Sequence, residues 1–414
     1  MPLEPRPLRI AMISLHTSPG DEPGSGDAGG MNVVVRHQAI AMGAAGHEVD
    51  IITRRSSPSQ PASMALAPGV TLRFLDAGPA EPVAKGRHEE FVDAFRAELA
   101  TLGRYDVLHS HHWFSGMAAL PLARDQRVPH VQSFHSIAAE SSTPLSHGER
   151  AESPGRLAGE AFLARESDAV VAISAAEADT TITRLGGSPD RVSIVPPGVD
   201  GDLFHPMTGA RSVRSGRASA VVAGRLHPLK GFDLAIETIA AVPARLRPEL
   251  VIAGDVSVDY DRYAEELAAH ARELGVADDV RFVGPQSRAD LAALFRESVL
   301  VLVPSHSETY GLVALEAAAS GTPTVVAASG GLREAVADGE TGIVLDSRDP
   351  AVWGEAVAGL LADPERIDRF AQAARARAEH FDWQRSGESL VAVYHSLLGP
   401  SAPAQHPATA TPAS

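Results

Sequence analysis

Short apolar stretches alternate with amphipathic or alanine-rich stretches along nearly the whole chain. The apolar stretches of the first half are residues 8–15, 49–53, 72–75, 107–109, 130–133 and 169–173, and a second series follows at 218–223, 250–253, 280–283, 299–303, 324–327 and 342–345. Stretches with helical character, such as 33–45, 89–102 and 157–166, lie between them. Strands that alternate with helices indicate a parallel sheet covered on both faces. Two such series predict an α/β protein with two doubly wound, Rossmann-like domains facing a cleft.

The boundaries follow from where the alternation stops. A segment rich in Pro, Gly, Ser and Arg predicts a linker over residues 197–217, between a first domain at 1–196 and a second at 218–380. The last helix, 381–398, is predicted to cross back to the first domain, and the Pro/Ala/Thr-rich tail 399–414 to be disordered. Ligands of wound sheets bind at the carboxyl ends of the strands, so the cleft between the domains is the expected site.

Composition narrows the classes of function. The 414 residues carry a formal net charge of −16, which argues against nucleic acid as a partner. There is no run of 18 apolar residues and no signal-peptide pattern at the start, so we expect neither a membrane span nor a membrane partner. Cysteine is absent, which is compatible with the reducing cytoplasm, where we expect the protein to act.

The segment 305–321, SHSETYGLVALEAAASG, is the most informative part of the chain. Glu308 lies in a polar loop after an apolar strand, and Glu316 is the one charge in the apolar helix 312–319. A helix start suits a phosphate, a carboxylate one turn later can accept hydrogen bonds from a ribose diol, and a loop carboxylate can reach a sugar. Solvent-facing glutamates are the simpler alternative, but a lone charge in a buried segment favours a nucleotide-sugar site.

Two strand-to-helix loops add candidate groups. After the first strand, Gly29 and Gly30 are flanked by Asp27 and Asn32 in a loop that is not a dinucleotide GxGxxG. It could be a mere long turn, although its length and polar flanks favour a ligand loop. In the second domain, Arg225 follows a strand and Lys230 precedes a helix. Either residue alone is explained as an ordinary surface cation. Two cations together at the cleft fit a diphosphate.

Histidines end two strands, in the sequences HSHHW (109–113) and QSFHS (132–136). Metal binding would need ligands at a characteristic spacing, and these stretches contain no Cys, no carboxylate at ligand spacing and no HExxH. We therefore predict no metal site, and expect histidines at strand ends to bind sugar hydroxyls or phosphate, or to shield a reacting centre.

These segments together resemble the retaining family-4 glycosyltransferases of the GT-B fold. The resemblance rests on SETYGLVALEAAASGTPTVV, GRLHPLKG and VPPGVDGDLFHP and covers about residues 8–396. The stretch MISLHTSPGDEPGSGDAGGMNV narrows it to the branch that begins mycothiol synthesis in actinobacteria. The implied activity is transfer of N-acetylglucosamine from UDP-N-acetylglucosamine to 1D-myo-inositol 3-phosphate.

The resemblance also implies roles for individual residues. The implied catalytic residues are His135, Arg225, Lys230 and Glu308. The implied donor site comprises Gly29, Gly30, Arg225, Lys230, Gln286, Glu308, Gly311, Leu312, Val313 and Glu316. The implied acceptor site comprises His16, Asp27, Asn32, Lys85, His112, Ser136 and Arg156. Three positions depart from the family: Gln286 stands where Arg is common, His112 where the family has Tyr, and Ser136 where it has Thr.

The implied mechanism is front-face transfer with retention, without a cofactor in catalysis. The family pattern allows a structural Mg²⁺ near residues 295–298 and a homodimer. Three alternatives stay open: a related transferase with another acceptor, a nucleotide-sugar epimerase, and a non-catalytic nucleotide-sugar sensor. An epimerase would need a pair of acid–base carboxylates, and only Glu308 is a candidate. A sensor would combine an intact donor site with a defective acceptor site.

Overall fold

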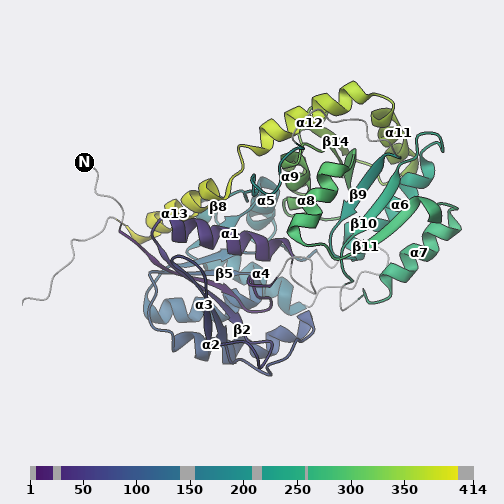
Figure 1. Ribbon diagram of the computed structural model, residues 1–414. Coiled ribbons are helices and arrows are strands. Elements are labelled where there is room, and N and C mark those ends of the chain that lie inside the picture. Colours follow the sequence, from purple (N-terminus) through teal and green to yellow (C-terminus); the bar gives the residue numbers. More distant parts are fainter. Residues whose placement is uncertain (1–5, 22–28, 140–153, 208–216, 257–259, 400–414) are drawn as a thin grey trace, which may run out of the picture.

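A parallel sheet covered by helices forms the first half of the protein. The computed structural model describes residues 6–21, 29–139, 154–207, 217–256 and 260–399 (Figure 1). The strands of this sheet are β1 (Arg9–Ser14), β2 (Glu48–Arg54), β3 (Ser63–Ala67), β4 (Val70–Leu75), β5 (Val107–His111), β6 (His130–Ser133), β7 (Ala169–Ala172) and β8 (Val192–Ile194). They lie in the order β3-β4-β2-β1-β5-β6-β7-β8. All neighbours are parallel except β3 and β4.

The second sheet is parallel throughout. Its strands are β9 (Ser219–Ala223), β10 (Glu249–Ala253), β11 (Val280–Gly284), β12 (Leu300–Val303), β13 (Thr324–Ala327) and β14 (Gly342–Leu345), in the order β11-β10-β9-β12-β13-β14. In both sheets the strand order reverses direction beside the first strand, β1 or β9. That reversal opens a crevice at the carboxyl ends of the strands.

Helices cover both faces of the first sheet. On one face α1 (Gly30–Ala44) and α13 (Trp383–Leu398) pack against Ile10, Met12 and Ile51. On the other face α2 (Val92–Ala100), α3 (Trp113–Gln126) and α4 (Pro154–Glu166) pack around Phe95 and Leu163. Because apolar side chains point to both faces, these strands read as continuous apolar runs rather than as alternating ones.

The second sheet is covered in the same way. One face carries α6 (Phe232–Ala241), α7 (Tyr263–Glu273) and α11 (Pro350–Leu361). The other carries α8 (Arg288–Glu297), α9 (Leu312–Ala319) and α12 (Pro364–Ala378). Two of these helices begin with a sequence signal for a helix start, Asp349-Pro350 and Asp363-Pro364, in which the aspartate side chain accepts a backbone N–H of the first turn.

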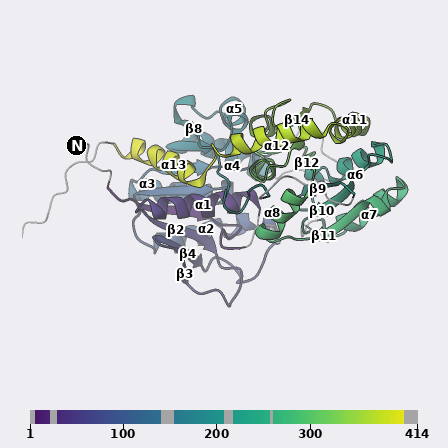
Figure 2. The same cartoon turned by 45° about the horizontal axis from the view of Figure 1, so that its top comes forward.

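The chain returns to the first domain at its end. Figures 1 and 2 both show the yellow helix α13 alongside the purple helix α1. Gln38 on α1 donates to Ser386 on α13 at 3.0 Å, and the hydroxyl of Tyr394 lies 2.7 Å from Nδ1 of His109 on β5. The chain runs between the domains twice, once after β8 and once before α13. These two segments are in contact, because the N–H of Val199 on the first donates to the carbonyl of Phe381 on the second.

Some features differ from the sequence-based expectations. The strands β3 and β8 were not predicted, and β3 adds an antiparallel edge to a sheet that we expected to be parallel. Lys85, a residue of the implied acceptor site, begins a 3₁₀ helix, η1 (Lys85–Phe91). Residues 208–216 of the predicted linker and 400–414 of the predicted tail lie outside the described residues. Among the helices that the structure describes, none is long and apolar enough to cross a membrane.

Candidate active site

A cavity of about 1070 Å³ lies between the two sheets, at the carboxyl ends of their strands. It brings together nearly all the residues that the sequence pointed to. From the first domain they are His16, Gly29, Gly30, Asn32, His112, His135, Ser136 and Arg156. From the second they are Arg225, Lys230, Gln286, Glu308, Gly311, Leu312, Val313 and Glu316. Two candidates are not among them, because Asp27 and the side chain of Lys85 lie outside the described part of the structure.

The start of α9 forms one wall of the cavity. Gly311 precedes this helix with φ 101°, a backbone conformation that favours glycine, and Leu312 and Val313 form its first turn. Because the first N–H groups of a helix have no partner within the helix and mark its positive end, they suit an anion. Lys230 ends the short helix η3 (Pro228–Lys230) directly before α6, and Arg225 follows β9, so both cations are at the same cavity.

The predicted sugar ligand Glu308 is ion-paired with one of these cations. Its Oε1 lies 2.5 Å from Nζ of Lys230 and also accepts the hydroxyl of Ser305 at 3.0 Å. Both side chains of the ion pair are partly exposed to the cavity, at 30% for Lys230 and 16% for Glu308. The pair keeps the cavity wall close to neutral, and Lys230 has further N–H donors for an incoming phosphate.

Glu316 is also paired with a cation, but unlike Glu308 it is buried. Its carboxylate accepts a hydrogen bond from Nη1 of Arg288 at 2.6 Å. Burial raises the pKa of Glu316, and the charge of Arg288 opposes that rise. Nothing in the sequence pattern around Arg288 singled it out, because a cation at a helix start normally faces solvent. Gln286, by contrast, turns back on its own loop, where Nε2 donates to the carbonyl of Val283 at 2.8 Å.

His135 contributes a neutral imidazole ring, one nitrogen of which has no hydrogen-bond partner among the described residues. Its backbone has φ 58°, which is unusual for a residue other than glycine, and its Nε2 lies 2.8 Å from Nδ1 of His111. Burial lowers the pKa of His135 to about 3. Its Nδ1 is buried and has no hydrogen-bond partner among the described residues. Buried polar atoms are normally hydrogen-bonded, so this nitrogen is available to a ligand.

The other strand-end histidines are divided between core and cavity. We expected strand-end histidines to bind sugar hydroxyls or phosphate, or to shield a reacting centre, but His109 is completely buried and bonded to Ser133 and Tyr394. His111 is also buried, with Nδ1 facing the His135 ring. His112 lines the cavity, where its ring lies 4.3 Å from that of His16. The expectation is therefore wrong for His109, which has a structural role.

The predicted acceptor residues form a second group in the cavity. Arg156 donates to the Ser136 hydroxyl at 3.1 Å and to the Glu160 carboxylate at 2.8 Å. Asn32 donates to the Thr17 hydroxyl at 2.9 Å, which ties the loop after β1 to the start of α1. The Oδ1 of Asn32 is buried without a hydrogen-bond partner in the described part of the chain. This group is polar and offers hydrogen-bonding side chains to a phosphorylated acceptor, while Glu160 balances the charge of Arg156.

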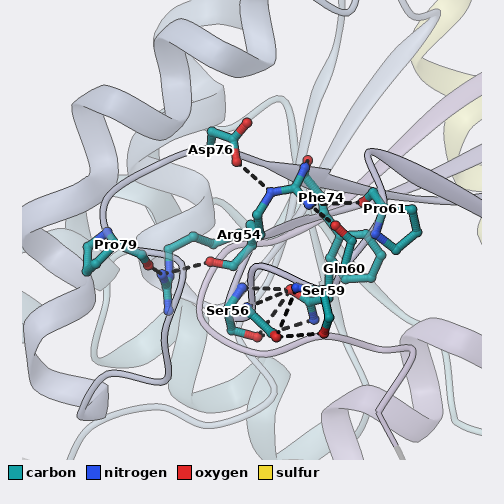
Figure 3. Close-up of polar contacts among 10 residues, drawn as sticks. Arg54, Ser56, Ser59, Gln60, Pro61, Phe74, Asp76 and Pro79 are labelled. Carbon is teal, nitrogen blue, oxygen red and sulfur yellow. Dashed lines mark hydrogen bonds and ion pairs between the residues drawn. The ribbon is translucent and has the colours of Figure 1, made fainter.

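The backbone that leads to Lys85 is anchored by a buried arginine. Figure 3 shows Arg54, at the end of β2, reaching the segment after β4. Its Nη1 donates to the carbonyl of Pro79 at 2.6 Å, and its Nη2 to the carbonyl of Glu81 at 2.9 Å. Burial lowers the pKa of Arg54. The anchor fixes the chain four residues before Lys85, whose side chain lies outside the described part of the structure.

Contacts between the domains close the sides of the cavity. The hydroxyl of Thr309 donates to the carbonyl of His135 at 2.6 Å. The carboxylate of Glu334 on α10 (Leu332–Ala335) accepts the N–H groups of Ala175 and Ala176, which begin α5 (Ala175–Thr183), at 2.9 and 3.0 Å. A carboxylate at a helix start is favourable for the same reason as an anionic ligand. Among the described residues no group of three or more His, Cys, Asp or Glu side chains could hold a metal ion.

Glu177 on α5 is a buried carboxyl group at the cavity that the sequence analysis missed. It accepts the N–H of Ile173 at 2.7 Å, and its Oε1 is buried without a hydrogen-bond partner among the described residues. The nearby backbone N–H of His135 acts, like that of Ile173, to lower its pKa. Burial raises its pKa from 4.5 to about 7. The sequence Ser174-x-x-Glu177 resembles an ordinary capping box, and Ser174 does cap α5, so the pattern gave no sign of a further role.

This raised pKa predicts a pH dependence of stability. Between pH 4.5 and 7 the folded protein holds a proton that the unfolded chain has released, so this group lowers stability as pH rises. Glu177→Gln removes the titration. We expect the unfolding free energy of the variant, relative to wild type, to rise by on the order of 2–3 kcal/mol from pH 5 to pH 8 in urea titrations. A difference that stays constant, as expected for the exposed control Glu265→Gln, would contradict this.

Comparisons with known proteins identify the fold and the family of this chain. The family model described as "Glycosyl transferase 4-like domain" matches residues 29–198, and the one described as "Glycosyl transferases group 1" matches residues 210–377. Among solved structures, sucrose-phosphate synthase from Thermosynechococcus elongatus superposes with a TM-score of 0.86 at 27% identity, covering 94% of this chain and 98% of that one. HepE from Anabaena, in complex with UDP and glucose, superposes with a TM-score of 0.74 at 19% identity, covering 93% and 98%. The two wound domains thus have the GT-B fold.

Curated relatives are similar over almost the full chain. D-inositol 3-phosphate glycosyltransferase from Stackebrandtia nassauensis is 40% identical, covering 95% of this chain and 92% of its own. The enzymes of the same name from Kribbella flavida and Geodermatophilus obscurus are each 41% identical, covering 95% and 94% of this chain and 97% and 89% of their own. The protein is therefore a glycosyltransferase, and its chain belongs to the D-inositol 3-phosphate glycosyltransferase family.

Proposed function

We propose that this enzyme transfers N-acetylglucosamine from UDP-N-acetylglucosamine to 1D-myo-inositol 3-phosphate with retention, the first step of mycothiol biosynthesis, in the cytoplasm. The identity of 40–41% to curated D-inositol 3-phosphate glycosyltransferases over nearly the whole chain carries this proposal. The cavity supports it, because a donor half that contains the cations Arg225 and Lys230 faces a polar acceptor half across the domain boundary.

The donor would lie against the second domain. Arg225, Lys230 and the start of α9 would hold the diphosphate, Glu316 the ribose diol, and Glu308 the transferred sugar. Gly30 permits a close approach from the other side, since a Cβ there would lie 3.2 Å from Leu312 Cδ1. Binding of the diphosphate would draw Lys230 partly away from Glu308 and so release that carboxylate for the sugar hydroxyls.

The reaction would proceed on one face of the sugar. The bond from the anomeric carbon to the diphosphate oxygen breaks, and the acceptor hydroxyl attacks from the side that the diphosphate leaves. The departing UDP takes the acceptor proton, and the charge that develops on it is stabilised by Arg225, Lys230 and the N–H groups of α9. This scheme uses no enzymic nucleophile and no metal ion, and the neutral Nδ1 of His135 would contact the sugar.

The acceptor assignment is tested by the products. With UDP-N-acetylglucosamine, we expect UDP to form only when inositol 3-phosphate is added, and mass spectrometry to show the N-acetylglucosaminyl adduct. UDP-sugars and GDP-sugars paired with several inositol phosphates and sugar phosphates complete the panel. Turnover with another acceptor but not with inositol 3-phosphate would show a related transferase. A changed sugar without acceptor would show an epimerase, and neither reaction would show a sensor.

Lys85 offers a specific prediction for the acceptor. It is the one cation between Asp76 and Gly86, in an acidic protein whose phosphorylated acceptor needs local positive charge. We expect Lys85→Ala to raise KM for inositol 3-phosphate about tenfold, which is about 1.4 kcal/mol, with little change in UDP affinity. Arg87→Ala is the matched control, since Arg87 is an exposed cation of the same short helix. An equal effect of both variants would mean that only the general charge of this surface matters.

A further inference from the structure

Arg288 occupies a position that none of the roles above explains. It is the first residue of α8, and its Nη1 lies 2.6 Å from Oε1 of Glu316 on the neighbouring helix α9. The side chains are 18% and 5% exposed, and both residues line the cavity. A cation placed there could serve the ligand directly or could act through Glu316.

The guanidinium group is held in place from a second side. Its Cζ lies 4.7 Å from the centre of the Phe204 ring, which is itself completely buried. A guanidinium over an aromatic face is stabilised by a cation–π interaction. Its charge also reaches the first domain, where burial first and Arg288 second lower the pKa of His37 on α1 to about 4. His37 therefore stays neutral at pH 7.

Other charged groups on the elements around α9 are engaged elsewhere. Arg296 on α8 donates to the carbonyl of Leu203, and Arg375 on α12 to those of Phe204 and Ala319. Arg377 donates to the carbonyl of Glu334, whose carboxylate binds the start of α5. Arg333 on α10 pairs with Asp346. Arg288 is the charged side chain that lowers the pKa of Glu316 against the effect of burial.

The state of Glu316 matters for the chemistry of its ligand. Two adjacent ribose hydroxyls each have a proton to donate, and an ionised carboxylate accepts with both oxygens. A protonated carboxyl has an O–H of its own and loses part of that capacity. The single bond from Arg288 occupies one lone-pair site of Oε1, so acceptor sites remain on both oxygens.

We propose that Arg288 is a positioning residue for the donor, holding Glu316 as an oriented carboxylate that recognises the ribose diol of a nucleoside diphosphate. This rests on the proposed function only in taking the donor to be a nucleotide sugar. Arg288 itself contacts Glu316 rather than the reacting atoms.

Calorimetric titration of the full-length enzyme with UDP and 2′-deoxy-UDP tests this role. In wild type we expect UDP to bind more tightly than 2′-deoxy-UDP. Arg288→Gln should weaken UDP binding about tenfold at pH 7 and should bind UDP and 2′-deoxy-UDP equally well. The affinity of this variant for UDP should recover as the pH is raised to 9, because Glu316 then ionises. Arg288→Lys, which keeps the charge, should restore much of the affinity. The exposed Arg262→Gln is the control variant, and thermal unfolding shows whether each variant is folded.

Three results would overturn the inference. They are unchanged UDP affinity in Arg288→Gln, a loss that is equal at pH 6 and pH 9, and a retained preference for the 2′-hydroxyl. ADP and GDP are titrated in parallel. If wild type binds one of these instead of UDP, the proposed donor is wrong, while the Arg288 comparison is made with that nucleotide and its deoxy form. If wild type binds no nucleoside diphosphate, both proposals fail.

Discussion

Lys230→Ala is expected to lower kcat by about a hundredfold or more. In the proposed reaction, negative charge develops on the departing diphosphate, so a cation in contact with it acts mainly on the transition state. The loss should therefore fall on kcat more than on donor affinity. Removal of Lys230 also frees Glu308 from its 2.5 Å ion pair and leaves an uncompensated carboxylate beside the phosphates, which adds to the effect. Initial rates at saturating donor and acceptor measure the change.

Arg225→Ala is the companion variant, and Arg333→Ala, at an exposed arginine of the same domain, is the control. If both cavity variants turned over like wild type and the control, the diphosphate would have to bind elsewhere. The double variant should lower kcat by a smaller factor than the product of the two single decreases, because both cations act on the same leaving group.

Tyr394→Ala is expected to be the most destabilising of the substitutions considered. Tyr394 is completely buried on α13, and truncation of a large buried aromatic costs about 3–5 kcal/mol. It also removes the hydroxyl partner of the buried His109, 2.7 Å away. Tyr394→Phe keeps the ring and should cost about 1–2 kcal/mol, the value of the hydrogen bond. Urea unfolding followed by circular dichroism gives the free energies.

Ser389→Ala, at an exposed position of the same helix, should leave the unfolding free energy within about 0.5 kcal/mol of wild type. If Tyr394→Ala unfolded at the same urea concentration as this control, α13 could not be docked on the first domain in solution.

The architecture could be predicted because its signal is local and repeated. Each central strand is an apolar run that is buried on both faces. The helices between the strands have apolar residues at a different spacing, so the two kinds of element can be told apart. The edge strands β3 and β8 lack this signal, because Ser63, Met64 and Ala65 are exposed and β8 has three residues of which none is buried. Edge strands of this kind take their conformation from the neighbouring strand, which a local pattern does not reveal.

The candidate site could be predicted where the topology alone places a residue. Arg225, Lys230 and Glu308 follow strands of one parallel sheet and so lie at one edge. Arg288 and Glu177 were missed because their roles depend on neighbours distant in sequence, Glu316 and His135. The histidines show most clearly where prediction from the sequence ends. His109 and His112 are three residues apart, yet one bonds to Tyr394 on the last helix while the other reaches the cavity.

The return of α13 to the first domain has a consequence for biosynthesis. Ribosomes deliver the chain from the N-terminus, so β1 to β8 emerge long before the helix that covers Ile10 and Met12. Until residue 398 has left the exit tunnel, that face of the sheet is covered by α1 alone, and His109 lacks its hydroxyl partner. A nascent chain stalled after α12 should therefore be a substrate for chaperones and proteases, even though every residue of the cavity has already been made.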